Sequence, residues 1–143
     1  MKRYFLVTAF IVLLAISLMG CSTDSKETIS IEGTWQAYGA MYDGEIHPFD
    51  DNYVNEEASE QVMGQTLTFN GDGTLVLNNG LTDLSGTYEP LDDGYLAKVP
   101  FGSAGETAEF TCVLQESDLV VTLVVPEGFE DDAGYSTVYR KAD

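Results

Sequence analysis

The chain has 143 residues, of which 24 are acidic and six are Lys or Arg, giving a formal net charge of −18. This excess of negative charge repels nucleic acid and anionic lipid head groups, so we expect no nucleic-acid binding and no membrane adhesion through the protein surface. The length and the 44% hydrophobic content suit one domain with an ordinary core, which we expect to be monomeric.

The N-terminal segment has the organisation of a secretory signal. Lys2 and Arg3 precede an uncharged apolar run, and Gly20 stands directly before Cys21. A charged start, a short apolar stretch and a small residue at the cleavage point are typical of exported proteins. The run is also short for a permanent membrane span. We therefore predict a signal peptide over residues 1–20.

Residues 18–21 resemble the lipobox of bacterial lipoproteins, in which the cysteine thiol is diacylated and becomes the first residue of the mature protein. The resemblance implies that Cys21 is lipidated and anchors the protein outside the cytoplasm, to the bacterial cell membrane or outer membrane. Ser22 follows the cysteine, which implies outer-membrane sorting in a two-membrane cell. The alternatives are an uncleaved anchor and a signal without lipid. Residues 21–30 would form a flexible tether.

Lipidation of Cys21 would leave Cys112 as the only thiol, so the mature chain could form no intramolecular disulfide. From Cys21 onward the chain has four basic residues and all 24 acidic ones, a net charge of −20. Stability must then come from the core. The acidic residues would keep an exported domain soluble and away from the membrane.

From Gly33 onward, apolar residues repeat with a period of two, which predicts β-strands. Residues 43–44 form an Asp-Gly turn signal, and residues 45–48 form a short extension that ends at Pro48. The alternate residues that we predict on the core face of the first strand are Trp35, Ala37, Gly39 and Met41.

Residues 55–63 break this pattern and predict one or two helical turns. Asn55 can cap the helix, and Glu56 and Glu57 would lie in its first turn, where the helix dipole favours acids. Gly64 would end it. The wider insert, residues 43–64, would then cover the mouth of the domain as a lid or fill it as a plug.

The rest of the chain is divided by Asn-Gly and Asp-Gly pairs, which favour hairpin turns. The clearest hairpin spans residues 65–78, with its turn at residues 71–73. The further strands that we predict cover residues 85–88, 95–101, 106–115, 119–125 and 135–140. About eight short strands in succession predict an all-β, antiparallel up-and-down barrel with one short helical insert between the first two strands.

Several of these segments together resemble the bacterial lipocalin-like lipoprotein domains. The segments are Gly33-Thr34-Trp35, the helical insert, the hairpin from Leu67 to Thr74, Gly86-Thr87-Tyr88 and Tyr139-Arg140-Lys141. The resemblance implies a calycin-type barrel over residues 31–143, with Gly33 and Trp35 at its closed floor. It also implies a basic residue over the indole, either Arg140 or Lys141, in a cation–π contact.

No residue set in the sequence predicts catalysis, so we expect neither enzymatic activity nor a cofactor. His47 is the one histidine and has no Cys at zinc-site spacing, which favours a surface position in a loop. Cys112 falls on the apolar face of its strand, which favours a buried structural thiol. Residues 70–74 are similar to the start of an EF-hand loop but lack its closing Glu, so we interpret them as a hairpin.

An acidic loop before the last strand is the best candidate for a calcium site or for contact with a cationic partner, because hard cations favour clustered carboxylates. A solvated loop explains the same residues, and we predict no metal. The carboxylates concerned are Glu127, Glu130, Asp131 and Asp132.

Two functions remain open. The first is a binding module that encloses a small hydrophobic ligand in its barrel. The second is a cell-envelope module with a filled barrel whose acidic loops contact a protein or polysaccharide. An apolar interior of several hundred cubic ångströms would favour the first. The candidate ligand or lid residues are Ala37, Gly39, Phe49, Tyr53, Val62, Met63 and Tyr88.

Overall fold

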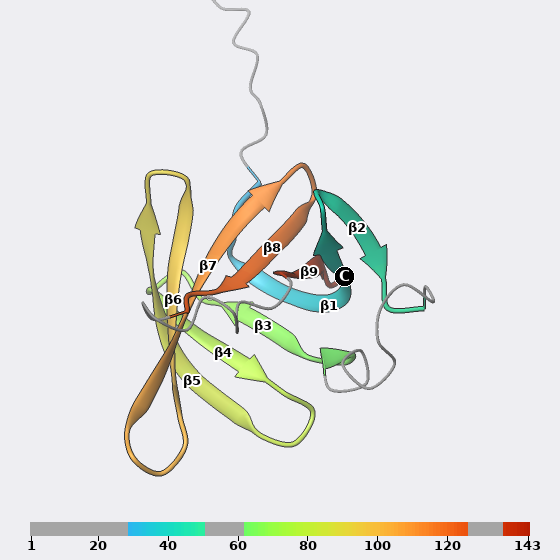
Figure 1. Ribbon diagram of the computed structural model, residues 1–143. Coiled ribbons are helices and arrows are strands. Elements are labelled where there is room, and N and C mark those ends of the chain that lie inside the picture. Colours follow the sequence, from blue (N-terminus) through green and yellow to red (C-terminus); the bar gives the residue numbers. More distant parts are fainter. Residues whose placement is uncertain (1–28, 51–61, 126–135) are drawn as a thin grey trace, which may run out of the picture.

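A computed structural model describes residues 29–50, 62–125 and 136–143. It contains nine antiparallel strands (Figure 1). They are β1 (Gly33–Tyr42), β2 (Glu45–Pro48), β3 (Thr66–Phe69), β4 (Thr74–Asn78), β5 (Asp83–Leu91), β6 (Gly94–Phe101), β7 (Glu106–Gln115), β8 (Asp118–Leu123) and β9 (Ser136–Lys141). The predicted signal peptide, Cys21 and the acidic loop lie outside the described residues.

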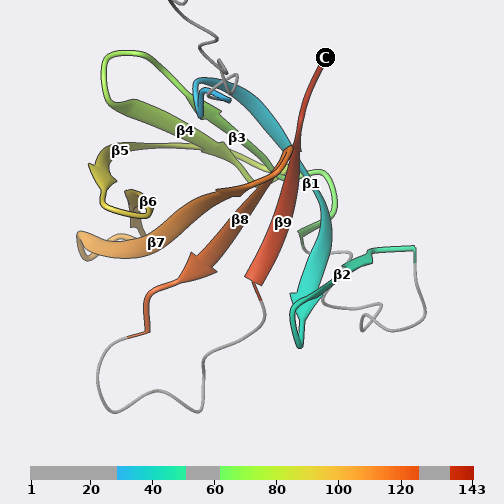
Figure 2. The same cartoon turned by 90° about the horizontal axis from the view of Figure 1, so that it is seen from above.

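Eight of the strands close into an up-and-down barrel. From β3 to β9 each strand pairs with its neighbour in sequence, and β1 pairs with both β3 and β9, which completes the ring. Strand β2 pairs with β1 and lies outside the ring. Figure 2 shows β5, β6 and β7 on the side of the barrel away from β1 and β9. The predicted all-β barrel is therefore confirmed.

The hairpin between β3 and β4 shows how local sequence sets the strand boundaries. Asn70 N donates to Thr74 O at 2.9 Å, and Asp72 Oδ1 accepts a hydrogen bond from Thr74 N at 3.0 Å. Gly73 has a φ of 83°, which glycine adopts without steric cost. The hairpin predicted over residues 65–78 is thus present, with its turn where the glycines lie.

No helical element occurs within the described residues. Of the predicted helix, residues 55–61 lie outside the described part, and only Val62 and Met63 can be placed. Val62 is partly buried against the core, whereas Met63 is 55% exposed. Nor does the described part of the chain contain a helix long and apolar enough to cross a membrane.

A β-bulge at Tyr38 reverses the two faces of β1. The pairing with β9 shifts its register between Ala37 and Gly39. Up to Ala37 the core face follows the predicted alternation, but beyond the bulge Ala40 is fully buried and takes the core position. The prediction that Gly39 and Met41 lie on the core face was wrong, because one extra residue changes the face of every residue after it.

Candidate functional site

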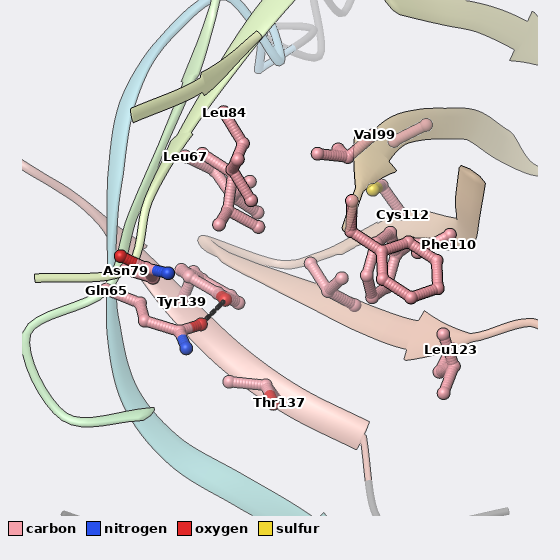
Figure 3. A pocket seen from close by; sticks show the side chains of 15 residues that line it. Gln65, Leu67, Asn79, Leu84, Val99, Phe110, Cys112, Leu123, Thr137 and Tyr139 are labelled. Carbon is pink, nitrogen blue, oxygen red and sulfur yellow. Dashed lines mark hydrogen bonds between the residues drawn. The ribbon is translucent and has the colours of Figure 1, made fainter. Parts of the chain in front are cut away.

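A cavity of about 370 Å³ lies inside the barrel (Figure 3). Strands β3 to β9 all contribute residues to its lining, and β1 contributes none. The lining is mainly apolar, and its apolar members include Leu67, Leu77, Leu84, Val99, Phe110, Cys112 and Leu123. An antiparallel barrel gives such a lining because alternate residues of every strand point inward.

The space arises where small residues lie opposite larger ones on β6 and β7. Ala97 pairs with Phe110, and Val99 pairs with Ala108, so each pair leaves one position without a long side chain. Phe110 in turn pairs with Leu123 on β8. The side chains of Val99, Phe110 and Leu123 form an apolar wall on one side of the cavity (Figure 3).

Polar side chains gather on the other side of the cavity. The last residue pair of β3 and β4 is Thr66 with Asn78, so the next residues in this register, Gln65 and Asn79, lie across from each other. The hydroxyl of Tyr139, on β9, donates to Gln65 Oε1 at 3.3 Å (Figure 3). We call Gln65, Asn79 and Tyr139 the polar patch of the cavity.

None of the described residues that line the cavity is charged. Cys112 is fully buried, as predicted, and burial raises the pKa of its thiol to about 12. Burial, together with the nearby Cys112, also raises the pKa of the Tyr139 hydroxyl. Both groups are therefore protonated at neutral pH, and the Cys112 thiolate that a nucleophilic reaction would need is absent.

Trp35 fills the barrel at the end away from the polar patch. It is fully buried, and its Nε1 donates to the carbonyl oxygen of Ile31 at 2.7 Å. Lys141 Nζ lies 5.3 Å from the centre of the indole and donates to Ser30 O at 3.1 Å. Gly33 has a φ of 113°, and a side chain there would also meet Lys141. The indole and these contacts close this end.

Arg140 lies on the outer face of the barrel rather than over the indole. Its guanidinium carbon is 3.7 Å from the centre of the Tyr38 ring, and its Nε is 3.3 Å from Asp118 Oδ1. The reason is the register, because Lys141 pairs with Trp35 and adjacent residues of a strand face opposite sides. The resemblance implied that either Arg140 or Lys141 lies over the indole, and the structure places Lys141 there.

The described candidate ligand residues do not line the cavity. Ala37, Phe49 and Met63 line a shallower groove beside β1 and β2, together with Arg140. Tyr53 lies outside the described residues. The remaining candidates lie elsewhere in the fold: Gly39 pairs with Pro48, Val62 packs against the core, and the Tyr88 ring is 5.0 Å from that of Phe69.

The candidates for metal chemistry are not brought together by the described fold. His47 lies in β2 rather than in a loop, is partly buried, and has its ring 5.9 Å from that of Tyr42. Within the described ranges, no group of three His, Cys, Asp or Glu residues could hold a metal ion. The carboxylates of the acidic loop, from Glu127 to Asp132, lie outside those ranges.

Sequence reasoning missed the polar patch and the small residues that make the space. Gln65 begins a predicted strand and has the same parity as the inward Leu67, but it was not chosen as a site residue; Asn79 stands in a predicted turn, where nothing in the local pattern assigned it to the interior. Ala108 stands between the polar Thr107 and Glu109, which was the available signal, whereas Ala97 stands between Leu96 and Lys98 and has no such pattern. The cross-strand register that places the two alanines opposite large residues can be seen only in the fold.

Comparison with protein-family models, curated proteins and solved structures found no match for this chain. The function is therefore inferred from the geometry and chemistry of the cavity.

Proposed function

We propose that this chain is a non-enzymatic binding protein that holds a small apolar molecule inside a lipocalin-like barrel, anchored outside the cytoplasm by a lipid on Cys21. The cavity is the observation that carries the proposal, because it measures about 370 Å³ and its lining is mainly apolar and uncharged. Ligand pockets typically measure about 300–1,000 Å³ and combine apolar walls with a few polar groups.

The distribution of large side chains supports binding over a filled barrel. Trp35 and Phe69 are almost completely buried and fill one end. Phe110 and Leu123 are also large, but they line the cavity rather than fill it, and Leu123 is 48% exposed. The barrel is thus packed at one end and hollow at the other, a shape that suits one small ligand.

The chemistry of the lining supports binding over catalysis. General acid–base catalysis is most efficient when the catalytic group has a pKa near the working pH. Cys112 and Tyr139 are the titratable groups among the described lining residues, and burial raises the pKa of each further from neutrality. They contribute shape and hydrogen bonding to the site.

A pair of substitutions on β7 tests the proposal. Ala108 lines the cavity, whereas its neighbour Thr107 is exposed on the other face of the strand. We expect Ala108→Phe to occupy the space and to weaken binding of the neutral dye N-phenyl-1-naphthylamine by about tenfold or more. Thr107→Phe adds the same ring outside and should leave dye binding unchanged. Dye fluorescence, which rises in apolar surroundings, measures both.

Native mass spectrometry of the purified protein provides a second measurement, because a ligand held inside the barrel adds a discrete mass. The proposal fails if the wild-type protein carries no ligand and does not bind the dye, or if both phenylalanine variants reduce dye binding equally. Either result would favour an envelope module that acts through its outer surface.

A further inference from the structure

We infer that the bound molecule is uncharged and carries an oxygen atom that accepts a hydrogen bond from the side-chain amide of Asn79. The inference rests on the proposed function, because it assigns the chemistry of a ligand in the same cavity. It depends on three features of the described residues: the orientation of Asn79, the absence of charge in the lining, and the separation of polar and apolar walls.

The turn between β4 and β5 fixes the orientation of the Asn79 side chain. Asn79 Oδ1 accepts hydrogen bonds from the backbone N–H groups of Leu81, at 3.0 Å, and Thr82, at 2.9 Å. The backbone N–H of Asn79 also donates to Thr82 O at 3.2 Å. Since the two N–H donors require an acceptor, the amide oxygen of Asn79 must face the turn. The NH2 group of the same amide must then point away from these two N–H groups.

The NH2 group of Asn79 is a donor at the cavity wall. It makes no hydrogen bond within the described part of the chain, and Asn79 lines the cavity. Figure 3 shows this amide near Gln65 and Tyr139. A ligand that covers the donor without accepting its hydrogen bond leaves a polar group desolvated, whereas a carbonyl or ether oxygen pairs with it. Ligands with an acceptor at this point are therefore favoured.

The lining disfavours a charged ligand of either sign. Fatty acids and other anions would need a cation beside the carboxylate, and the described lining contains none. An ammonium group would need a carboxylate, which the described lining also lacks. Burying a charge without a partner costs far more than burying a neutral polar group. The chain's net charge of −18 adds to the repulsion of anions.

The apolar wall defines the rest of the ligand. Val99 and Phe110 face the cavity from β6 and β7, and neither offers a hydrogen bond. A second polar group on the ligand, pointing toward this wall, would lose its hydration without gaining a partner. The site thus suits a molecule with one polar end at Asn79 and an apolar body against Val99 and Phe110.

A matched ligand series tests this assignment on the whole protein. The series shares one ring system, naphthalene. 2-Acetylnaphthalene adds a neutral carbonyl to it, and 2-naphthoate adds a carboxylate. We expect the acetyl compound to bind about three- to tenfold more tightly than naphthalene, the range that one hydrogen bond supplies. The naphthoate should bind most weakly. Displacement of N-phenyl-1-naphthylamine gives the three dissociation constants.

A substitution at Asn79 links the preference to one atom. Asn79→Asp keeps the oxygen that accepts from Leu81 and Thr82 and replaces the NH2 donor by a second oxygen. We expect it to weaken binding of 2-acetylnaphthalene by about three- to tenfold and to leave naphthalene unchanged. Asn70→Asp is the matched control, because it makes the same change in the exposed turn between β3 and β4 and should alter neither ligand.

The outcomes separate the two proposals. If naphthalene and the dye both fail to bind, the proposed function is wrong and this inference falls with it. If both bind but the acetyl compound binds no better than naphthalene, the binding function stands and the assignment of a neutral acceptor ligand is overturned. Tighter binding of 2-naphthoate than of the acetyl compound, or equal loss of all three ligands in Asn79→Asp, overturns it too.

Discussion

Trp35 joins three segments that are far apart in the sequence. It pairs with Leu67 on β3 and with Lys141 on β9, and its ring N–H donates to Ile31 before β1. The side chain has no exposed surface. Since an indole buries a large apolar area and its N–H needs a partner when buried, the hydrogen bond to Ile31 removes the main cost of placing it in the core.

Trp35→Ala should therefore lower the free energy of unfolding by about 3–5 kcal/mol, the usual cost of truncating a buried aromatic residue. Trp35→Phe, the matched control, keeps an aromatic ring and loses the hydrogen bond to Ile31, so its cost should be smaller, about 1–3 kcal/mol. Urea denaturation followed by circular dichroism measures both. A Trp35→Ala variant as stable as the wild-type protein would show that the indole does not hold the closed end.

At the residue scale, the sequence predicted the position of Trp35 but not the identity of its cation. The motif of Gly33 and Trp35 and the apolar alternation after it indicated a buried indole, which the structure shows. Arg140 and Lys141 are adjacent and alike in charge, so choosing between them requires the register of β9 against β1. The sequence alone does not supply that register.

At the scale of elements, glycines mark places where strands approach too closely for a side chain. A Cβ added at Gly86 on β5 would lie 2.3 Å from the backbone oxygen of Lys98 on β6, and one added at Gly39 on β1 would lie 2.6 Å from the backbone oxygen of His47 on β2. Glycine inside a strand often marks such a close backbone approach. These two positions therefore help to set how the strands bend around the barrel.

Gly86→Ala should separate β5 from β6 and destabilise the barrel by about 1–3 kcal/mol, because the added methyl group would meet a backbone atom that cannot rotate away. Ser85 precedes it on the same strand and is exposed, so Ser85→Ala should change stability by less than about 0.5 kcal/mol. Thermal unfolding compares the two variants. Equal melting temperatures for Gly86→Ala and the wild-type protein would contradict the close approach.

Element order was predictable from the sequence because each turn signal is local. The Asn-Gly and Asp-Gly pairs lie between strands, and the apolar alternation indicated which face of most strands is buried. The bulge at Tyr38 was not predictable, because it depends on the register of β9 against β1 and on β3 and β2 pairing along different parts of β1. The cavity was missed for a related reason, since its volume depends on side chains opposite one another on different strands.

At the scale of the whole molecule, the few described basic residues are already engaged. Lys98 Nζ lies 3.5 Å from Glu89 and 3.7 Å from Glu109. Arg140 contacts Asp118, and Lys141 contacts Ser30 and the indole. The described surface therefore offers no cluster of unpaired cations for an anionic membrane, and attachment through the domain surface is disfavoured electrostatically.

Membrane attachment should consequently depend on Cys21 and resist a high-salt wash, because an acyl chain is held by hydrophobic rather than ionic interactions. We expect labelled palmitate to be incorporated into the wild-type protein and not into Cys21→Ala. Cys112→Ala is the control, because it removes the buried thiol inside the barrel and should retain the label.

Label that persists in Cys21→Ala and disappears in Cys112→Ala would place the lipid on the other cysteine and contradict the anchor. Release of the wild-type protein by salt would instead show attachment through surface charge, against the repulsion expected from a mature charge of −20.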